Sequence, residues 1–346
     1  MRAAKLKVGV MNQQKSSQAD ALRAALPTSE AREIKVRDVQ FGFGTHVILF
    51  LMRWLLRPWL ARALRGSPER IAKIQIQMAS RLCKNSSGLP LDYDIVGKAP
   101  GHVLGSLKDS HKPAILWLHG GAFILPAVPE VHVHIVSKMC RDLDAVGFLP
   151  DYRLTPFNKF PAALDDCENA YRALLDIGFS ANRIVLAGES AGGNLVLGVL
   201  QRIRKAGLPM PACAIPVSPA GDMGRSHAPP SRVLRASRDP ILPITALSPV
   251  AEMYVGDWDA SDPEVSPLFA DFKGFPPLFL LASNNEILLD ETVLMARRAI
   301  AAGVPTRLDI WPLLPHAFPL FERVFPKAKL ARQDMVEFMR QHVAVT

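Results

Sequence analysis

Ser190 lies in a segment whose residue types suit nucleophilic chemistry, R-I-V-L-A-G-E-S-A-G-G-N-L over residues 183–195. The short apolar run Ile184–Ala187 predicts a buried strand, and a segment with helical apolar periodicity follows the serine. Gly188 and Gly192 flank the serine at the spacing of a nucleophile elbow, a strained strand-to-helix turn that leaves little room for side chains. Such a turn lifts the serine Oγ clear of the sheet and brings it near helix N–H groups that can receive negative charge.

A second group follows the apolar run Ala114–Leu118, as H-G-G-A over residues 119–122. Paired glycines let backbone N–H groups approach a ligand closely, which an oxyanion hole requires. An ordinary tight turn has the same composition, but the presence of a nucleophilic serine favours the oxyanion hole. We expect its donors to be the backbone N–H groups of Gly120, Gly121 and Ala191.

His316 is the histidine best placed to act as a general base. It lies in L-P-H-A-F, residues 314–318, shortly after the last predicted strand. Because parallel sheets collect their active groups at the carboxyl ends of the strands, this position is within reach of Ser190 Oγ. The chain has nine histidines, and no supporting context distinguishes His111, His132, His134 or His342.

The elements that must position these groups begin after about residue 90, where apolar runs alternate with helical patterns. Continuous apolar runs separated by helices predict an α/β protein with a mainly parallel sheet covered on both faces. Residues 1–90 are expected to be mostly helical, residues 86–90 (S-S-G-L-P) to form a linker, and residues 219–262 to form an insertion. Strands are expected at Ala114–Leu118, Val146–Pro150, Ile184–Ala187, Cys213–Val217, Leu278–Ala282 and Leu308–Trp311. Helices are expected at Ala162–Leu175, Leu195–Ala206, Thr292–Ala301 and Leu330–Val343.

Composition and charge narrow the function classes. The chain has 346 residues, of which 49% are hydrophobic and 21% charged, the profile of a globular protein with a large core. Its formal net charge of +9 would suit nucleic acid or anionic lipid, but zinc-finger spacing and basic-aromatic interleaving are missing, so nucleic-acid binding is not expected. The N-terminal sequence lacks the apolar core of a secretory signal. The cysteines have no metal-ligand spacing and are expected to remain thiols, which indicates a cytoplasmic protein: Cys83, Cys140, Cys167 and Cys213.

Residues 46–65 include the most apolar stretch, but they make a poor membrane span because Arg53, Arg57, Arg62 and Pro58 interrupt it. The favoured interpretation is a helix docked on the protein's own core. The alternatives are weak contact of this helix with a membrane surface or an apolar substrate, or with a second subunit in a homodimer.

Five blocks in the same order resemble one known family. They are H-G-G-A (119–122), P-D-Y-R-L-T-P (150–156), F-P-A-A-L-D-D (160–166), G-E-S-A-G-G-N (188–194) and P-H-A-F (315–318). Together they are similar to the hormone-sensitive-lipase group of carboxylesterases, the bacterial family IV esterases, which have the α/β-hydrolase fold. The match runs from about residue 90 to the end of the chain. The sequence departs from the family at Ala122, usually glycine, and at Glu189, usually Asp or Thr; an alanine keeps its backbone N–H, so neither change disables the chemistry.

The acid that orients the histidine is expected after the strand Leu278–Ala282. Many members of the family carry D-P-L-x-D there, with the first Asp as the acid. Aligned by the leucine and the final aspartate, E-I-L-L-D (286–290) places Glu286 at the acid position. A slip of one residue would place Asn285 there, whose amide cannot stabilise an imidazolium. Asp290 is the other candidate acid, although it suits a helix N-terminus better.

The resemblance implies a serine carboxylesterase that needs neither cofactor nor metal, acts on small ester substrates and forms an acyl-enzyme. Residues 1–90 and the insertion 219–262 would build a helical cap over a catalytic domain at 91–346, and such caps go with short or medium acyl chains. One alternative is a catalytically silent ligand-binding protein on the same fold, like the plant gibberellin receptors, which retention of Ser190 and His316 argues against. Another is a hydrolase of lactones, carbamates or amides.

Other charged residues have structural interpretations. Asp165 and Asp166 begin a predicted helix and are expected to cap it or to form ion pairs. The D-Y-R segment at 151–153 is expected to brace the fold. The roles of Asp222 and Asp239 are left open by the sequence.

Overall fold

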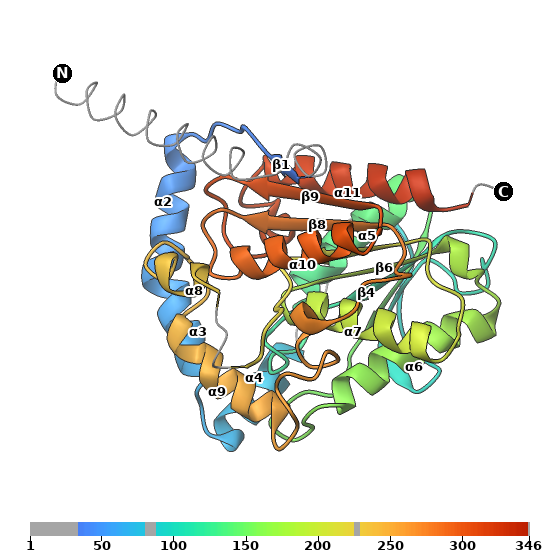
Figure 1. Ribbon diagram of the computed structural model, residues 1–346, viewed down its shortest axis with the longest axis horizontal. Coiled ribbons are helices and arrows are strands. Elements are labelled where there is room, and N and C mark those ends of the chain that lie inside the picture. The colour runs from blue at the N-terminus through green and yellow to red at the C-terminus, as the bar shows by residue number, and fades with distance from the viewer. Residues whose placement is uncertain (1–33, 80–87, 225–228, 345–346) are drawn as a thin grey trace.

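The computed structural model describes residues 34–79, 88–224 and 229–344. Within them, nine strands form one sheet in the order β1-β9-β8-β7-β6-β4-β5-β3-β2 (Figure 1). Neighbouring strands run parallel from β1 to β5, and β3 and β2 continue the sheet antiparallel at one edge. The predicted mainly parallel sheet is confirmed.

The six predicted strands form the centre of this sheet. Every residue of strands β4, β5, β6, β7 and β8 is buried. Because helices cover both faces of the sheet, the side chains on both faces of each strand must be apolar. The ends differ from the predicted ones by two residues at most. The bounds are Ala114–Leu118 (β4), Val146–Pro150 (β5), Ile184–Glu189 (β6), Cys213–Val217 (β7), Leu278–Ser283 (β8) and Thr306–Trp311 (β9).

Three strands are not among the predicted ones, the edge strands β1 (Ile34–Val36) and β2 (Leu91–Val96) and the strand next to β2, β3 (Ala99–Leu104). Strand β1 pairs with β9, so part of the segment expected to be helical belongs to the sheet. Three residues are too few to show a period. Strands β2 and β3 form a hairpin whose turn includes Gly97 at φ 67°. Strand β2 carries polar residues because its side chains from Asp92 to Ile95 are exposed.

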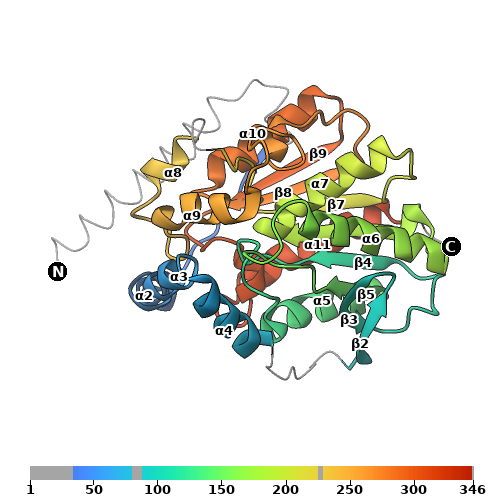
Figure 2. The same cartoon turned by 90° about the horizontal axis from the view of Figure 1, so that it is seen from below.

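Two layers of helices cover the sheet (Figure 2). Helices α6 (Ala162–Ile177), α7 (Ala191–Lys205) and α10 (Leu289–Ala301) pack on one face, and α5 (Pro129–Leu143) and α11 (Ala328–His342) pack on the other. The two apolar cores therefore lie above and below the central strands.

Four of these helices match predicted ones, and α5 is an addition. Helix α7 begins four residues before the predicted Leu195, because the elbow turns directly into the helix through small residues that carry no apolar periodicity. In α5 the polar side chains of His132 and His134 are buried, which hides the apolar face in the sequence pattern.

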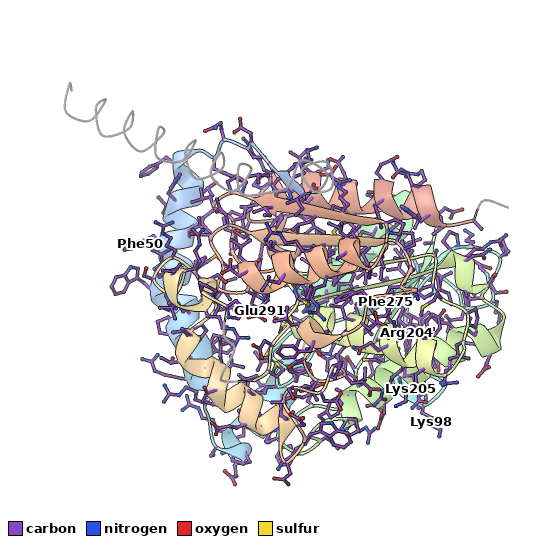
Figure 3. The ribbon with its side chains drawn as sticks, in the orientation of Figure 1. Phe50, Lys98, Arg204, Lys205, Phe275 and Glu291 are labelled. Carbon is purple, nitrogen blue, oxygen red and sulfur yellow. The ribbon has the colours of Figure 1, made fainter. Side chains whose placement is uncertain are left out.

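The remaining helices gather at one end of the molecule, on the left in Figure 1. Helix α2, a π-helical segment η2 and helix α3 follow one another without a break, and Figure 3 shows Phe50 of α2 pointing away from the body of the protein. The bounds are Phe43–Leu51 (α2), Met52–Leu56 (η2), Arg57–Ala63 (α3), Pro68–Ala79 (α4), Ser231–Leu234 (α8) and Ile244–Val255 (α9). Short 3₁₀ turns lie at Ala181–Arg183 (η3), Pro267–Phe269 (η4) and Phe318–Phe321 (η5).

These helices contact the rest of the protein through hydrogen bonds. Gln75 of α4 donates to the carbonyl oxygens of Ile124 (2.7 Å) and Thr155 (2.9 Å). The proposed division into a cap of residues 1–90 and 219–262 and a catalytic domain of residues 91–346 stays a prediction. In the predicted linker, residues 86 and 87 lie outside the described part of the chain. No helix among the described residues is long and apolar enough to cross a bilayer.

Three of the four cysteines are described, and they are free and buried: Cys140, Cys167 and Cys213. Burial raises the pKa of each of these thiols. Cys83 lies outside the described residues.

Candidate active site

Ser190 forms the sharp turn between β6 and α7 that the sequence predicts. Its backbone has φ 57° and ψ −118°, a strained conformation for a residue with a side chain. The neighbouring glycines are sterically required, because a Cβ at Gly188 or at Gly192 would lie 2.4 or 1.9 Å from the carbonyl oxygen of Leu118. The N–H of Ser190 donates to Val217 O at 2.9 Å, which ties the elbow to the end of β7.

Glu286 and His316 form a buried pair at the ends of β8 and β9. Nδ1 of His316 lies 2.5 Å from Oε2 of Glu286. The other carboxylate oxygen accepts hydrogen bonds from Ser283 N (2.8 Å) and from Ser218 Oγ (2.9 Å). Because a carboxylate can only accept, the ring carries its proton on Nδ1 and leaves Nε2 as a basic nitrogen.

Nε2 of His316 is buried, and within the described part of the chain it has no hydrogen-bond partner. Burial lowers the pKa of this imidazole, but the hydrogen bond and the charge of Glu286 outweigh burial, and the charges of Asp239 and Glu189 add to them. The pKa of His316 is therefore raised above its ordinary value.

The strand order brings the elbow and this pair to one edge of the sheet. Strands β6, β7, β8 and β9 are consecutive neighbours, and Ser190, Ser218, Glu286 and His316 all follow their carboxyl ends. Ser218 connects them: it directly follows Val217, which accepts from Ser190 N, and its hydroxyl contacts Glu286 and, at 3.4 Å, Ala317 N.

The two competing acid candidates make other contacts. Asp290 lies in the first turn of α10 and accepts a hydrogen bond from Ser231 N of α8 at 2.8 Å. Asn285 donates from its side chain to Leu313 O at 3.0 Å. Of the three, Glu286 is the residue in contact with His316.

The H-G-G-A loop lies directly against the elbow, because a Cβ on Gly120 would be 3.1 Å from Ser190 Cβ. One expected oxyanion donor requires correction: the N–H of Gly120 donates to Glu189 Oε1, so it is not free for an oxyanion. In the regions that the structure describes, no acceptor is found for the backbone N–H groups of Gly121, Ala122 and Ala191.

Glu189 and His132 form a second buried acid–histidine pair behind this loop. Nε2 of His132 lies 2.8 Å from Glu189 Oε1. Burial lowers the pKa of His132, but the charge of Glu189 and its hydrogen bond outweigh burial and raise it above the ordinary value. Sequence reasoning could not select His132, because helix α5, which carries it, was not predicted.

His119 and Tyr152 complete the support of the loop. Their rings stack with centroids 4.2 Å apart, and the Tyr152 hydroxyl donates to His119 O at 2.6 Å. Burial, with the nearby positive charge of His132, lowers the pKa of His119 to about 4, so this ring is neutral. The predicted bracing role of the 151–153 segment agrees with this contact.

Asp239, whose role the sequence left open, lies next to the acid. Its carboxylate accepts hydrogen bonds from Ile241 N (2.9 Å), Leu242 N (2.8 Å) and Ile287 N (3.0 Å). Because Ile287 follows Glu286 in the chain, these bonds connect the insertion to the acid loop. Burial raises the pKa of Asp239, while the charge of His316 lowers it in part.

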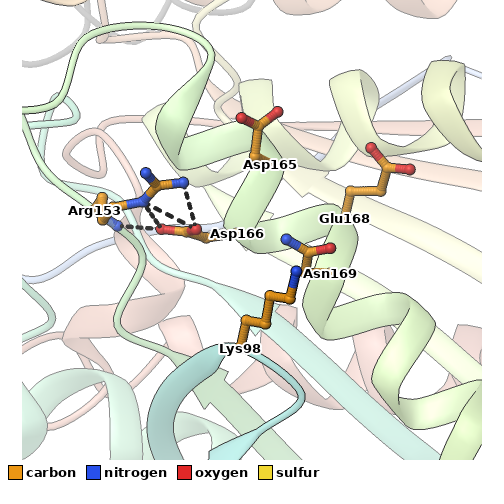
Figure 4. Close-up of a pocket in the computed structure, with 6 residues that line it drawn as sticks. All are labelled: Lys98, Arg153, Asp165, Asp166, Glu168 and Asn169. Atoms are coloured by element: carbon orange, nitrogen blue, oxygen red, sulfur yellow. Dashed lines mark hydrogen bonds and ion pairs between the residues drawn. The ribbon is translucent and has the colours of Figure 1, made fainter.

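A separate polar hollow of about 520 Å³ lies over α6 (Figure 4). Its carboxylates are already paired: Asp166 binds the Arg153 guanidinium at 2.8 Å, and Asp165 and Glu168 bind Arg202 at 2.5 and 3.2 Å. The expected ion-pairing role of Asp165 and Asp166 is confirmed. Across residues 34–79, 88–224 and 229–344, no group of three or more His, Cys, Asp or Glu side chains is arranged to hold a metal ion.

The sheet order and the serine elbow define a class of protein. The sequence model of a family described as alpha/beta hydrolase fold matches residues 115–320, more than half of the chain. The chain belongs to this family, in its hormone-sensitive-lipase-like group, and is an enzyme of the esterase and lipase class.

Individual relatives agree with this assignment. The chain is 32% identical to an acetyl-hydrolase of Streptomyces hygroscopicus over 82% of its own length and 92% of that protein. It is 33% identical, with a TM-score of 0.77, to the crystal structure of EstE5-PMSF, and the structure of EstE5 soaked by p-nitrophenyl butyrate gives a TM-score of 0.78. Each comparison covers 88% of this chain and all of the other. An esterase from the bacterial hormone-sensitive lipase family is 28% identical, with a TM-score of 0.76 over the same shares.

Proposed function

We propose that this enzyme hydrolyses short- to medium-chain acyl esters with Ser190 as nucleophile, His316 as general base and Glu286 as the acid that orients it. The observation that carries the proposal is the buried contact of 2.5 Å between Glu286 and His316, which leaves a basic nitrogen at the edge where the elbow ends. The carboxylate fixes the ring tautomer and stabilises the imidazolium that forms during attack.

The reaction proceeds in two halves. Ser190 Oγ bonds to the ester carbonyl carbon while His316 Nε2 takes its proton, and the carbonyl oxygen becomes an anion. As the C–O bond to the alcohol breaks, the imidazolium returns the proton to the leaving oxygen, and an acyl-serine remains. Water then attacks the acyl carbon with the same base, and the serine leaves with the proton.

Backbone N–H groups stabilise the oxyanion in both halves. Gly121 and Ala191, together with Ala122, supply donors without an acceptor of their own, and Gly120 supplies none because Glu189 occupies its N–H. Glu189 acts as a positioning residue, since its carboxylate holds the start of the loop against the elbow and is itself held by His132 Nε2 at 2.8 Å.

The preference for short acyl chains rests on relatives. The Streptomyces relative is an acetyl-hydrolase, and a p-nitrophenyl butyrate soak exists for EstE5. The helices α4, α8 and α9 would supply the apolar wall of the acyl pocket.

A panel of p-nitrophenyl esters from acetate to laurate tests the proposal on the wild type and Ser190→Ala. We expect the highest kcat/KM among the short esters and, in the variant, a loss of roughly a millionfold in kcat. Residual turnover near wild type in the folded variant would reject Ser190 as nucleophile. A maximum at laurate would reject the chain-length preference alone.

A further inference from the structure

The helix that runs through α2, η2 and α3 leaves a row of large apolar side chains in water. Phe43 is 84% exposed, Trp54 65% and Leu55 68%. The whole row recurs at intervals of three and four residues, so it follows one side of the helix: Phe43, Val47, Phe50, Leu51, Trp54, Leu55 and Trp59. We call these seven residues the α2–α3 stripe.

The α2–α3 stripe is larger than an ordinary monomer surface carries. At roughly 150–250 Å² for a complete large side chain, its members together expose on the order of 800 Å², against 300–600 Å² for the largest patch of a typical monomer. The other side of the helix packs on the protein: Leu49 and Ala63 are buried, and Ile48, Met52 and Leu60 are partly buried against the two cores. The α2–α3 stripe is the side that remains in solvent.

The charge of this helix has one sign. Between Phe43 and Pro68 the sequence contains four arginines and no carboxylate. Arg53 and Arg57 reach across to Arg238 O and Asp239 O of the insertion, whereas Arg62 and Arg65 are exposed. A basic helix with an apolar side matches the chemistry of an anionic lipid surface, where acyl chains receive the apolar side chains and phosphates receive the guanidinium groups.

We propose that the α2–α3 stripe docks on a membrane surface that contains anionic phospholipid, with the helix lying in the plane of the interface. A second copy of the chain fits less well, because a two-fold contact through this helix would bring its arginines together with no carboxylate between residues 43 and 68 to pair them. A helix that lies in the plane of the membrane interface does not have to be long enough to span the bilayer.

The helix is also connected to the acid loop, so docking has a defined orientation. Arg57 donates to Asp239 O at 3.2 Å, and the Asp239 carboxylate accepts from Ile287 N beside Glu286. A neighbouring apolar pair on α8, Val233 and Leu234, each 71% exposed, lies close by in sequence to Arg238, which Arg53 contacts. The enzyme would therefore bind the lipid surface through the end of the molecule that carries α2, α3, α4, α8 and α9.

Vesicle co-sedimentation of the full chain tests the proposal. Vesicles of phosphatidylcholine alone and with about one third phosphatidylglycerol are compared at low and high salt. The test variant is Phe50→Ser with Trp54→Ser; the matched control is Ile95→Ser, an equally exposed apolar residue on β2 at the far edge of the sheet. We expect binding to the anionic vesicles that salt weakens, and a loss of about tenfold or more in the test variant with none in the control.

Each other outcome overturns the proposal. Absence of binding to anionic vesicles removes it, and so does equal loss in the two variants. Equal binding with and without phosphatidylglycerol removes the role of the arginines. A wild-type dimer in light scattering that the test variant abolishes, without vesicle binding, assigns the stripe to a second copy instead. Hydrolysis of a water-soluble acetate ester, measured in parallel, reports on the proposed active site independently of docking.

Discussion

In most proteins charged side chains lie on the surface and apolar ones inside. The carboxyl edge of the sheet departs from this rule by burying charged groups, and the α2–α3 helix departs from it by exposing apolar ones. At the sheet edge, Glu189, Asp239, Glu286 and His316 are buried, where charges are normally excluded. On the helix, phenylalanine and tryptophan side chains lie in water. The first arrangement is stable because each buried carboxylate has hydrogen-bond donors, whereas the second has no partner in the described chain that would cover it.

The contrast suggests two different roles: the sheet edge serves the reaction, and the helix serves contact with another surface. A buried charge with hydrogen-bond donors around it is held in one geometry, which a reaction needs. Removing one of its partners leaves the others unsatisfied. An exposed apolar side chain costs the fold little when it is changed, so its effect should appear only when another surface is present. Substitutions at the two regions should therefore differ in what they change.

The largest expected effect in this comparison is at the acid. Glu286→Gln keeps the size of the side chain but removes the charge that stabilises the imidazolium, and an amide can hold the wrong ring tautomer. We expect kcat to fall by about 10⁴-fold with the fold retained. Asp290→Asn is the matched control: it should change kcat by a few-fold at most, since Asp290 binds Ser231 N. Equal losses in the two variants would contradict the assignment of the acid.

A smaller loss is expected at Glu189. Glu189→Gln keeps an oxygen for Gly120 N–H but leaves the raised-pKa imidazole of His132 without its counter-charge. We expect kcat to fall by about 10- to 100-fold with KM little changed, because the loop positions donors for the transition state. Steady-state kinetics on a short ester separates the two parameters. A lower melting temperature with unchanged kcat would mean that the pair serves stability alone.

The pH dependence should move when a charge near His316 is removed. The base must be neutral, so kcat/KM falls as pH decreases through the His316 pKa, which Glu286, Asp239 and Glu189 raise. Asp239→Asn removes one raising charge, and the acid limb should move to lower pH by a few tenths to about one unit. Rates followed by pH-stat titration give the limb. A shift to higher pH, or none, would show that the Asp239 charge does not act on this histidine.

The smallest effect on the isolated enzyme is expected on the helix. Because Phe50 and Trp54 are mostly exposed, their joint replacement by serine should change the free energy of unfolding by no more than about 0.5 kcal/mol at each site and leave hydrolysis of a soluble acetate ester unchanged. Urea unfolding and kinetics in the absence of lipid measure both. A large destabilisation would show that the stripe packs against the protein and would remove the contrast.

The sequence predicted the central sheet because its strands are continuous apolar runs, and it predicted the elbow because only glycine fits at 188 and 192. It favoured Glu286 over Asn285 and Asp290 as the acid, and Glu286 is the residue that contacts His316. It missed β1, since three residues show no period, and α5, since two buried histidines interrupt the apolar face. It took Gly120 as a free donor and did not foresee that the Glu189 carboxylate would occupy its N–H. The contact joins positions 69 residues apart, and no local pattern reports it.

The buried cysteines have a practical consequence for any covalent study of this enzyme. Cys140, Cys167 and Cys213 are buried, and burial raises the pKa of their thiols. We therefore expect that they do not react with iodoacetamide or maleimides in the native state. Once Cys83 is replaced, a single cysteine introduced on the surface could carry a fluorophore without interference. A serine-directed phosphonate would then label the Ser190 hydroxyl, and a thiol reagent would label the introduced cysteine. One molecule could therefore carry a different probe at each of the two positions.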